Sequence, residues 1–152
     1  MNQPARQSRA QARSAARLAA VQALYQHEME ATPIARLLDE FHQHRLGEEI
    51  DEAQMAEAEV DFFDDVVKGA TARQTEIDNL LEARLAEGWS LKRLDRTMLQ
   101  ILRAGTYELL ARADVPTASA ISEYVDVAHA FFDAREAKFV NGVLDAAAKA
   151  VR

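Results

Sequence analysis

Histidine and carboxylate side chains cluster in one stretch of the sequence, residues 39–44, which contains Asp39, Glu40, His42 and His44. Imidazole and carboxylate groups at close spacing are ligands of zinc and related metals. Residues two apart on a helix point away from each other, so His42 and His44 would meet at a metal only on extended chain. We therefore expect surface histidines here and no metal site.

Motifs for covalent or hydrolytic chemistry are missing from the sequence. His27-Glu28 is not followed by a second histidine at the spacing of the zinc metalloproteases. The five serines lack the glycine-flanked turn of a nucleophile, and no two glycines lie close enough for a phosphate-binding loop. The chain has no Cys, which excludes thiolate chemistry and suits a reducing cytosol. We expect a protein that is not an enzyme and uses no cofactor.

Positive charge gathers at the two ends of the chain, although the formal net charge is −7. Residues 1–17 contain four arginines and no acid, and residues 135–152 contain four basic residues against Glu136 and Asp145. Between them, residues 28–65 hold thirteen acids against two arginines. This distribution favours one face that binds an anion and another that meets a basic protein. Solvated helix faces without a partner would give the same pattern.

Helical periodicity runs through the whole chain of 152 residues. Apolar residues make up 49% of it and charged residues 28%, and five glycines with three prolines supply few turns for a sheet. No apolar run approaches the length of a membrane span. We therefore predict an all-α, single-domain bundle of about seven helices, and we expect it in the cytoplasm.

Proline, glycine and capping residues mark the ends of the expected helices. Pro33 follows the end of the first helix, and Gly69 predicts a bend or a boundary within the third helix. Ser90 and Asp95 stand where N-caps are expected. Residues 42–53 lack periodicity and are predicted to form a loop.

Asn141-Gly142 would ordinarily indicate a hairpin turn, but the apolar residues around it keep helical spacing. A glycine inside a helix is less favourable than alanine by about 1 kcal/mol. Close approach of a second helix and close approach of a ligand both explain such a glycine.

Two stretches of the sequence resemble the NusB family of bacterial transcription antitermination factors. The first is AVQALY, residues 20–25, with Arg13 and Arg17 before it. The second and more specific stretch is KFVNGVLD, residues 138–145. The resemblance covers nearly the whole chain from about residue 9. Between these two motifs, the family's order and spacing are also followed by residues 102–109 and by Asp114-Val115-Pro116.

This resemblance implies two packed helical subdomains and a role without catalysis. Family members pair with NusE, a small-subunit ribosomal protein, and bind the single-stranded boxA element of nascent RNA in the transcription elongation complex, which supports ribosomal RNA transcription. We place a flexible basic arm at residues 1–8 and a NusB-like RNA-binding domain at residues 9–152. One alternative is a helical interaction module that forms a homodimer and does not bind RNA specifically. Another, for a fragment of a longer chain, is the first domain of a ribosomal RNA cytosine methyltransferase.

Arginines near the start of the chain are candidate phosphate contacts. Arg13 and Arg17 match basic positions of the family, whereas Arg6 and Arg9 are assigned on charge alone. Tyr25 matches a family position at the functional surface, where RNA and the protein partner are both expected. A tyrosine at the edge of the core is the alternative for Tyr25.

The closing motif supplies the remaining RNA contacts that the resemblance implies. Lys138 would anchor the RNA backbone, and Phe139 would stack on a base. Asn141 and Gly142 would let RNA, or the neighbouring helix, come close. Burial in the core is the alternative for Phe139.

Three positions depart from the family pattern. Met98 stands where many relatives carry an acid that faces NusE, so we expect an apolar partner contact there. Ser122 replaces the usual Asn, and Glu136 replaces a small hydroxyl residue just before the closing motif. The negative charge of Glu136 would lie near the RNA.

Overall fold

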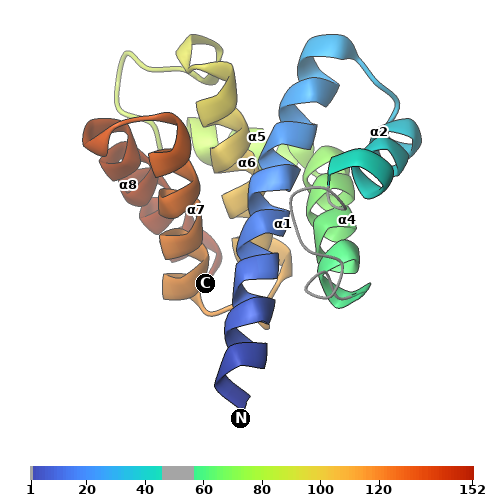
Figure 1. Cartoon of the computed structure of the whole chain (residues 1–152). Helices are drawn as coiled ribbons and strands as arrows, with labels where there is room; N and C mark the ends of the chain where they lie inside the picture. Colours follow the sequence, from blue (N-terminus) through green and yellow to red (C-terminus); the bar gives the residue numbers. More distant parts are fainter. Residues whose placement is uncertain (1, 46–56) are drawn as a thin grey trace. The chain divides into compact units, whose positions relative to one another are not determined.

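The computed structural model of the chain describes residues 2–45 and 57–152, with side chains described within 9–43 and 59–152. These residues form seven α-helices, a π-helical turn and a short 3₁₀-helix, and they contain no strand (Figure 1). The predicted all-α class is therefore confirmed.

The chain divides into two compact units, of which the first spans residues 1–68. Small and aliphatic residues along one face of α1 are buried, and Phe41 stacks on Phe63 with 5.6 Å between the ring centroids. As predicted, the first helix ends before Pro33. The helical segments of this unit are α1 (Asn2–Glu30), α2 (Ile34–Glu40), the π-helical turn η1 (Phe41–Arg45) and most of α4 (Glu57–Ala72).

The structure places helical segments where two predictions expected an arm and a loop in the first unit. Residues 2–8, expected as a flexible basic arm, are the first turns of α1, so such an arm would extend this helix, and its flexibility stays a prediction. Of the loop predicted over residues 42–53, the part up to Arg45 is π-helical, which is a correction. The remainder of that loop lies outside the described residues.

Gly69 does not bend its helix. Helix α4 continues to Ala72, and the break comes at Arg73, before α5 (Gln74–Glu82). A Cβ at position 69 would lie 2.1 Å from Cζ of Tyr107, so the glycine makes room for that ring. The predicted boundary is therefore present but lies at Arg73, and the predicted bend at Gly69 itself is wrong because this glycine serves packing.

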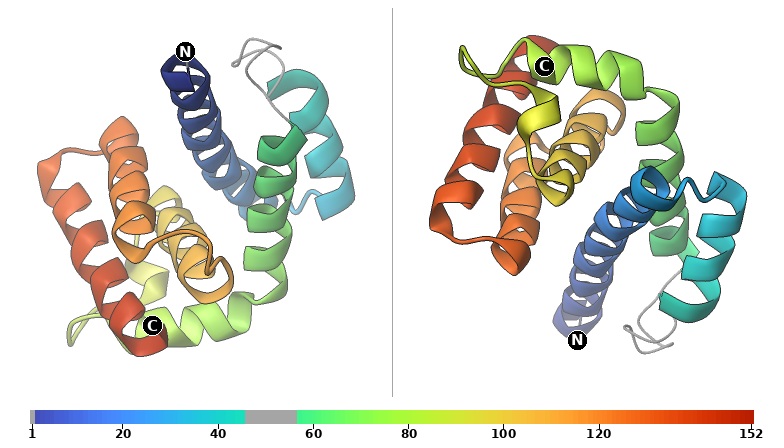
Figure 2. Two further views of the ribbon diagram at one scale, coloured as in Figure 1. Left: turned by 90° about the horizontal axis from the view of Figure 1, so that it is seen from below. Right: turned by 90° about the horizontal axis from the view of Figure 1, so that it is seen from above.

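The second unit, residues 69–152, is built around α6 (Arg96–Ala111), in which every residue from Met98 to Leu109 is buried. Helices α7 (Thr117–Phe131) and α8 (Ala134–Val151) pack against α6 and against each other (Figure 2). The exposed face of α8 is therefore the one that points away from this three-helix core.

The connection between α5 and α6 carries part of the candidate site. Asp95 caps α6 as predicted, because its carboxylate accepts hydrogen bonds from two backbone N–H groups of the first turn at 2.8 and 3.1 Å. Ser90 makes no capping hydrogen bond to the 3₁₀-helix η2 (Leu91–Arg93), which corrects that prediction. The Glu82 carboxylate instead accepts a hydrogen bond from the Leu91 N–H at 3.1 Å.

Candidate nucleic-acid interface

The closing motif lies on α8, and helical spacing divides it into two faces. Lys138, Asn141 and Gly142 share an exposed face, because positions three and four apart are neighbours on a helix. The helical placement of Asn141-Gly142 is confirmed. The opposite face is buried in the second unit and consists of Val140, Val143 and Leu144.

Gly142 has open space around it. A Cβ built at this position would meet no described heavy atom within 4 Å outside its own stretch of helix. At Gly105 in α6, by contrast, a Cβ would lie 2.9 Å from Cδ1 of Leu144. Close packing between helices therefore explains Gly105 and does not explain Gly142.

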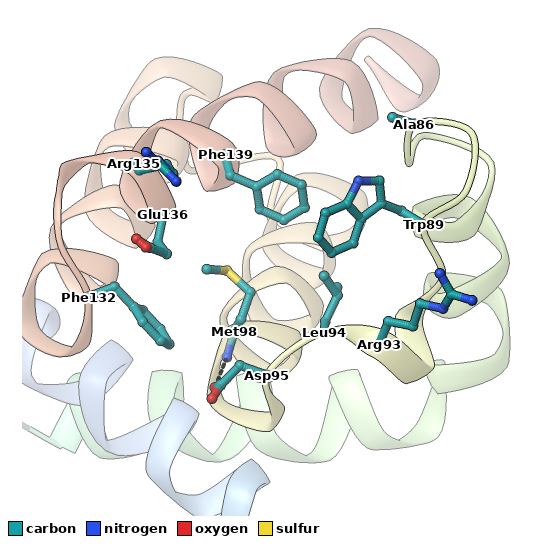
Figure 3. Close-up of a pocket in the computed structure, with 10 residues that line it drawn as sticks. All are labelled: Ala86, Trp89, Arg93, Leu94, Asp95, Met98, Phe132, Arg135, Glu136 and Phe139. Carbon is teal, nitrogen blue, oxygen red and sulfur yellow. Dashed lines mark hydrogen bonds between the residues drawn. The ribbon is translucent and has the colours of Figure 1, made fainter.

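Phe139 is half-buried rather than a core residue. Its ring lies 6.4 Å from the ring of Trp89, centroid to centroid, with 43° between the two planes. Both rings line a pocket of about 400 Å³ within the second unit (Figure 3). The side chains that complete the lining come from three segments: Ala86, Arg93, Leu94 and Asp95 from the α5–α6 connection, Met98 from α6, and Phe132, Arg135 and Glu136 around the start of α8.

Met98, the expected partner contact, lies on the wall of this pocket and is only 4% exposed. A ligand or a protein partner would reach its side chain only through the pocket. Ser122, another departure from the family pattern, is exposed on α7 and lines a separate groove together with Asn141.

The start of α8 brings two carboxyl groups together. Asp133 caps the helix by accepting a hydrogen bond from the Arg135 N–H at 3.3 Å. A hydrogen bond between the carboxyl groups of Asp133 and Glu136 raises the pKa of Glu136 and lowers the pKa of Asp133. Above both pKa values, Glu136 places a negative charge at the pocket, next to the exposed Arg135.

The arginines of α1 become less accessible along the helix. Arg9 is exposed, whereas 29% of the Arg13 side chain is exposed and its Nε lies 3.4 Å from a carboxylate oxygen of Glu59. The Arg13 guanidinium lies 4.3 Å above the centre of the Phe62 ring. Arg17 lies 4.9 Å from the same centre and is 4% exposed.

The predicted phosphate contacts differ in how accessible their side chains are. Arg9 is accessible to a phosphate and Arg13 is so only in part, and both contacts stay predictions. The burial of Arg17 gives it a packing role in the first unit, and its phosphate contact stays a prediction that requires the side chain to leave Phe62. The side chain of Arg6 lies outside the described residues. Tyr25 is 39% exposed, so it is available for the contact assigned to it.

Trp89 is the residue that sequence reasoning missed. It marked only the end of a helix in the sequence, yet its side chain is 54% exposed beside Phe139. The available signal was its position: the single tryptophan of the chain follows Gly88 in a short break between helices.

His42 of the first unit makes an ordinary surface contact with a carboxylate. His42 Nε2 lies 2.6 Å from Oδ1 of Asp64, and the side chain of His44 lies outside the described residues. Among the residues that the structure describes, no three His, Asp or Glu side chains come together in a way that could hold a metal ion. None of the described helices combines the length and apolar character needed to cross a membrane.

The fold and this surface define an all-helical binding protein that presents a lysine, an amide and an aromatic pocket. The NusB family model matches residues 14–149. Transcription antitermination protein NusB of Novosphingobium aromaticivorans is 72% identical over 141 residues, which cover 93% of this chain and 95% of that protein. The NusB of Sphingopyxis alaskensis is 69% identical over 144 residues, 95% of this chain and 97% of that protein.

Solved structures agree with these relatives. NusB of T. maritima superimposes with a TM-score of 0.73 at 33% identity and covers 90% of both chains. A chain from the crystal structure of antitermination factors NusB and NusE in complex with dsRNA has a TM-score of 0.78 at 26% identity, over 92% of this chain and 98% of that one. The chain belongs to the NusB family of transcription antitermination proteins.

Proposed function

We propose that the protein binds single-stranded boxA RNA together with NusE, and that it acts in transcription antitermination without catalysing a reaction. The observation that carries this proposal is the exposed face of α8, which presents Lys138, Asn141 and Gly142, with the half-buried ring of Phe139 at its edge next to Gly142. Family membership supports it, since one related chain of known structure comes from a complex of NusB and NusE with dsRNA. A protein that acts on nascent ribosomal RNA would be located in the cytoplasm, at the transcription elongation complex.

Each group on this face suits single-stranded RNA. The Lys138 ammonium attracts phosphate, and the amide of Asn141 donates and accepts hydrogen bonds as a base edge requires. The ring of Phe139 offers a stacking surface, worth about 1–3 kcal/mol per base. Gly142 leaves room for the RNA backbone because no side chain covers the helix there.

The acidic part of the chain suits a basic protein partner. Residues 28–65 hold thirteen acids against two arginines, and ribosomal proteins are basic as a rule. We propose NusE as that partner, with Tyr25 among its contacts, and the NusE contact expected at Met98 stays a separate prediction that requires a NusE side chain in the pocket. A homodimer of the free protein stays a separate prediction, which the molar mass from light scattering in the absence of NusE tests.

Fluorescence anisotropy of a labelled boxA RNA tests the proposal. The protein is titrated alone and with purified NusE, at two salt concentrations, against a scrambled RNA and a double-stranded form. We expect selective binding of the single strand that tightens with NusE. Binding should weaken with salt by a log–log slope of about −0.7 per neutralised phosphate. Equal, weak binding to all three RNAs, unchanged by NusE, would contradict the proposal.

Matched substitutions on α8 locate the surface. Lys138→Ala should weaken binding several-fold and reduce the salt slope by about 0.7, the loss of one phosphate contact. Lys149→Ala is the control, because this lysine lies at the other end of α8, with 79% of its side chain exposed and an ion pair to Asp145. Equal effects of the two substitutions would leave only general attraction between RNA and a positive helix.

A further inference from the structure

Trp89 forms one wall of the pocket beside Phe139, outside the closing motif. It lies between α5 and η2 and leaves 54% of its side chain in water. An exposed tryptophan gives up much of the stabilisation that burying its large ring would bring. Exposed aromatic rings around a concave apolar surface are typical of binding sites.

Hydrogen bonds hold the loop that carries this ring. Gly88 has a φ of +88°, which favours glycine, and the Trp89 N–H donates to the Ala86 carbonyl at 3.0 Å. The guanidinium of Arg93 donates to the Gly88 carbonyl at 3.0 Å. Arg96 donates to carbonyls of the following 3₁₀ turn at 2.7 and 2.8 Å. The backbone that carries the ring is thus held in place before a ligand binds, which lowers the entropy lost on binding.

The shape of the pocket fits one flat ring system. Its volume of about 400 Å³ lies in the lower part of the usual range for small-molecule sites, about 300–1,000 Å³. Leu94, Met98 and Phe132 supply apolar walls, as Figure 3 shows. The 43° between Trp89 and Phe139 is not the geometry of a parallel pair, so the two rings form an angled wall. A base that stacks on one ring would meet the other with its edge.

Two arginines at the pocket can meet the phosphates of a nucleotide. Arg93 and Arg135 line the pocket and are exposed, and the carbonyl bonded by Arg93 does not neutralise its charge. Two acids also line the pocket: the Asp95 carboxylate accepts hydrogen bonds from two backbone N–H groups of α6, whereas the Glu136 carboxylate would oppose a nearby phosphate. Aromatic stacking next to cations is the combination that binds single-stranded nucleic acid.

We propose that this pocket receives one unstacked base of the RNA, with Trp89 as its stacking ring and with Arg93 and Arg135 on the adjacent phosphates. The proposal rests on the RNA-binding function proposed above and adds to it a defined subsite for a single nucleotide. The competing occupant is a side chain of NusE that reaches Met98, and a base in the pocket would replace that predicted partner contact. The experiment separates the two occupants.

Tryptophan fluorescence provides a direct test, because Trp89 is the single tryptophan of the chain. The full-length protein is titrated with unlabelled boxA RNA and, separately, with a tryptophan-free NusE. We expect RNA to quench the emission over the concentration range in which anisotropy reports binding, and NusE alone to leave it unchanged. RNAs with one abasic nucleotide at successive positions then locate the stacked base.

Substitution of Trp89 makes the assignment specific. Trp89→Leu should weaken boxA binding roughly tenfold, the effect of losing one base–aromatic stack, and Trp89→Phe should recover most of it. One abasic position should weaken binding to the parent protein and not to Trp89→Leu. Phe131→Leu is the control, since this ring is 41% exposed on α7 and does not line the pocket. Thermal unfolding checks that each variant folds.

The outcomes separate the subsite from the general function. Selective RNA binding with unchanged Trp89 emission, together with parental affinity of folded Trp89→Leu, would overturn the subsite and leave the proposed function standing. Quenching by NusE alone, with weaker NusE binding in Trp89→Leu, would also overturn it and assign the pocket to a protein. Absence of any boxA binding would overturn both proposals.

Discussion

Helices α1 and α8 both carry predicted RNA contacts, but the motif on α8 presents its groups to solvent more fully than the arginines of α1 do. On α8, Lys138, Asn141 and Gly142 are exposed. On α1, access falls from the exposed Arg9 to Arg17, which is 4% exposed. Positive charge in a sequence therefore marks a candidate surface, and burial decides which charges can form it.

The physical reason is the same in both helices, although the outcome differs. Residues four apart lie on one face, so Arg13 and Arg17 both reach the ring of Phe62. Arginine can cover an aromatic ring with its flat guanidinium and its apolar stem. On α8, valines and leucine fill the inner face, which leaves the polar motif residues outside.

The largest effect that we expect concerns the stability contributed by Arg17, the buried arginine of α1. Arg17→Ala should lower the free energy of unfolding by about 2–3 kcal/mol, because it removes a desolvated cation–π contact and the packing of the arginine stem. In a domain of this size the melting temperature should fall by roughly 4–12 °C. Chemical and thermal denaturation measure this loss.

Arg9→Ala is the matched control, since an exposed arginine of the same helix should change stability by less than about 0.5 kcal/mol. If Arg17→Ala kept the parental stability and lost RNA affinity instead, Arg17 would belong to the RNA surface. The contrast between the two helices would then disappear.

Gly142→Ala tests the exposed side, with opposite signs for stability and binding. The added methyl group meets no described atom within 4 Å, so the better helix propensity of alanine should raise the free energy of unfolding by about 1 kcal/mol. RNA affinity should fall several-fold if the RNA backbone approaches at this position. Denaturation and anisotropy on the same samples measure both quantities.

Gly105→Ala is the control for this pair, because its Cβ would lie 2.9 Å from Leu144 and the stabilising gain should be lost. A stabilised Gly142→Ala that bound RNA with parental affinity would show that the glycine does not mark a contact.

The helical fold was predictable because its signals are local. Periodicity and capping indicated the all-α class, the end of the first helix before Pro33 and the cap by Asp95. The packing role of Gly69 was not predictable, because it depends on the ring of Tyr107, which is distant in sequence.

The candidate site was predictable in part for the same reason. The motif identified the exposed residues of α8, but the burial of Arg17 depends on Phe62, and the pocket at Phe139 depends on Trp89. Both partners lie on other segments, so helical spacing alone could not reveal them. Pairs that form across the fold set the accessibility of a residue, whereas its own sequence neighbours set only its face.

The smallest effect that we expect concerns a charge that opposes binding. If RNA lies along the start of α8, it experiences the carboxylate of Glu136 as well as the ammonium of Lys138, and Glu136→Gln should tighten binding about twofold. Two unit charges about 8 Å apart in water repel by about 0.5 kcal/mol, and salt should screen the gain. Anisotropy at low and high salt measures it, with Asp145→Asn, at the paired Asp145 further along α8, as the control. Unchanged affinity at low salt would place the RNA away from the first turn of α8. The RNA-binding surface of α8 would then consist of Lys138, Asn141 and Gly142 alone.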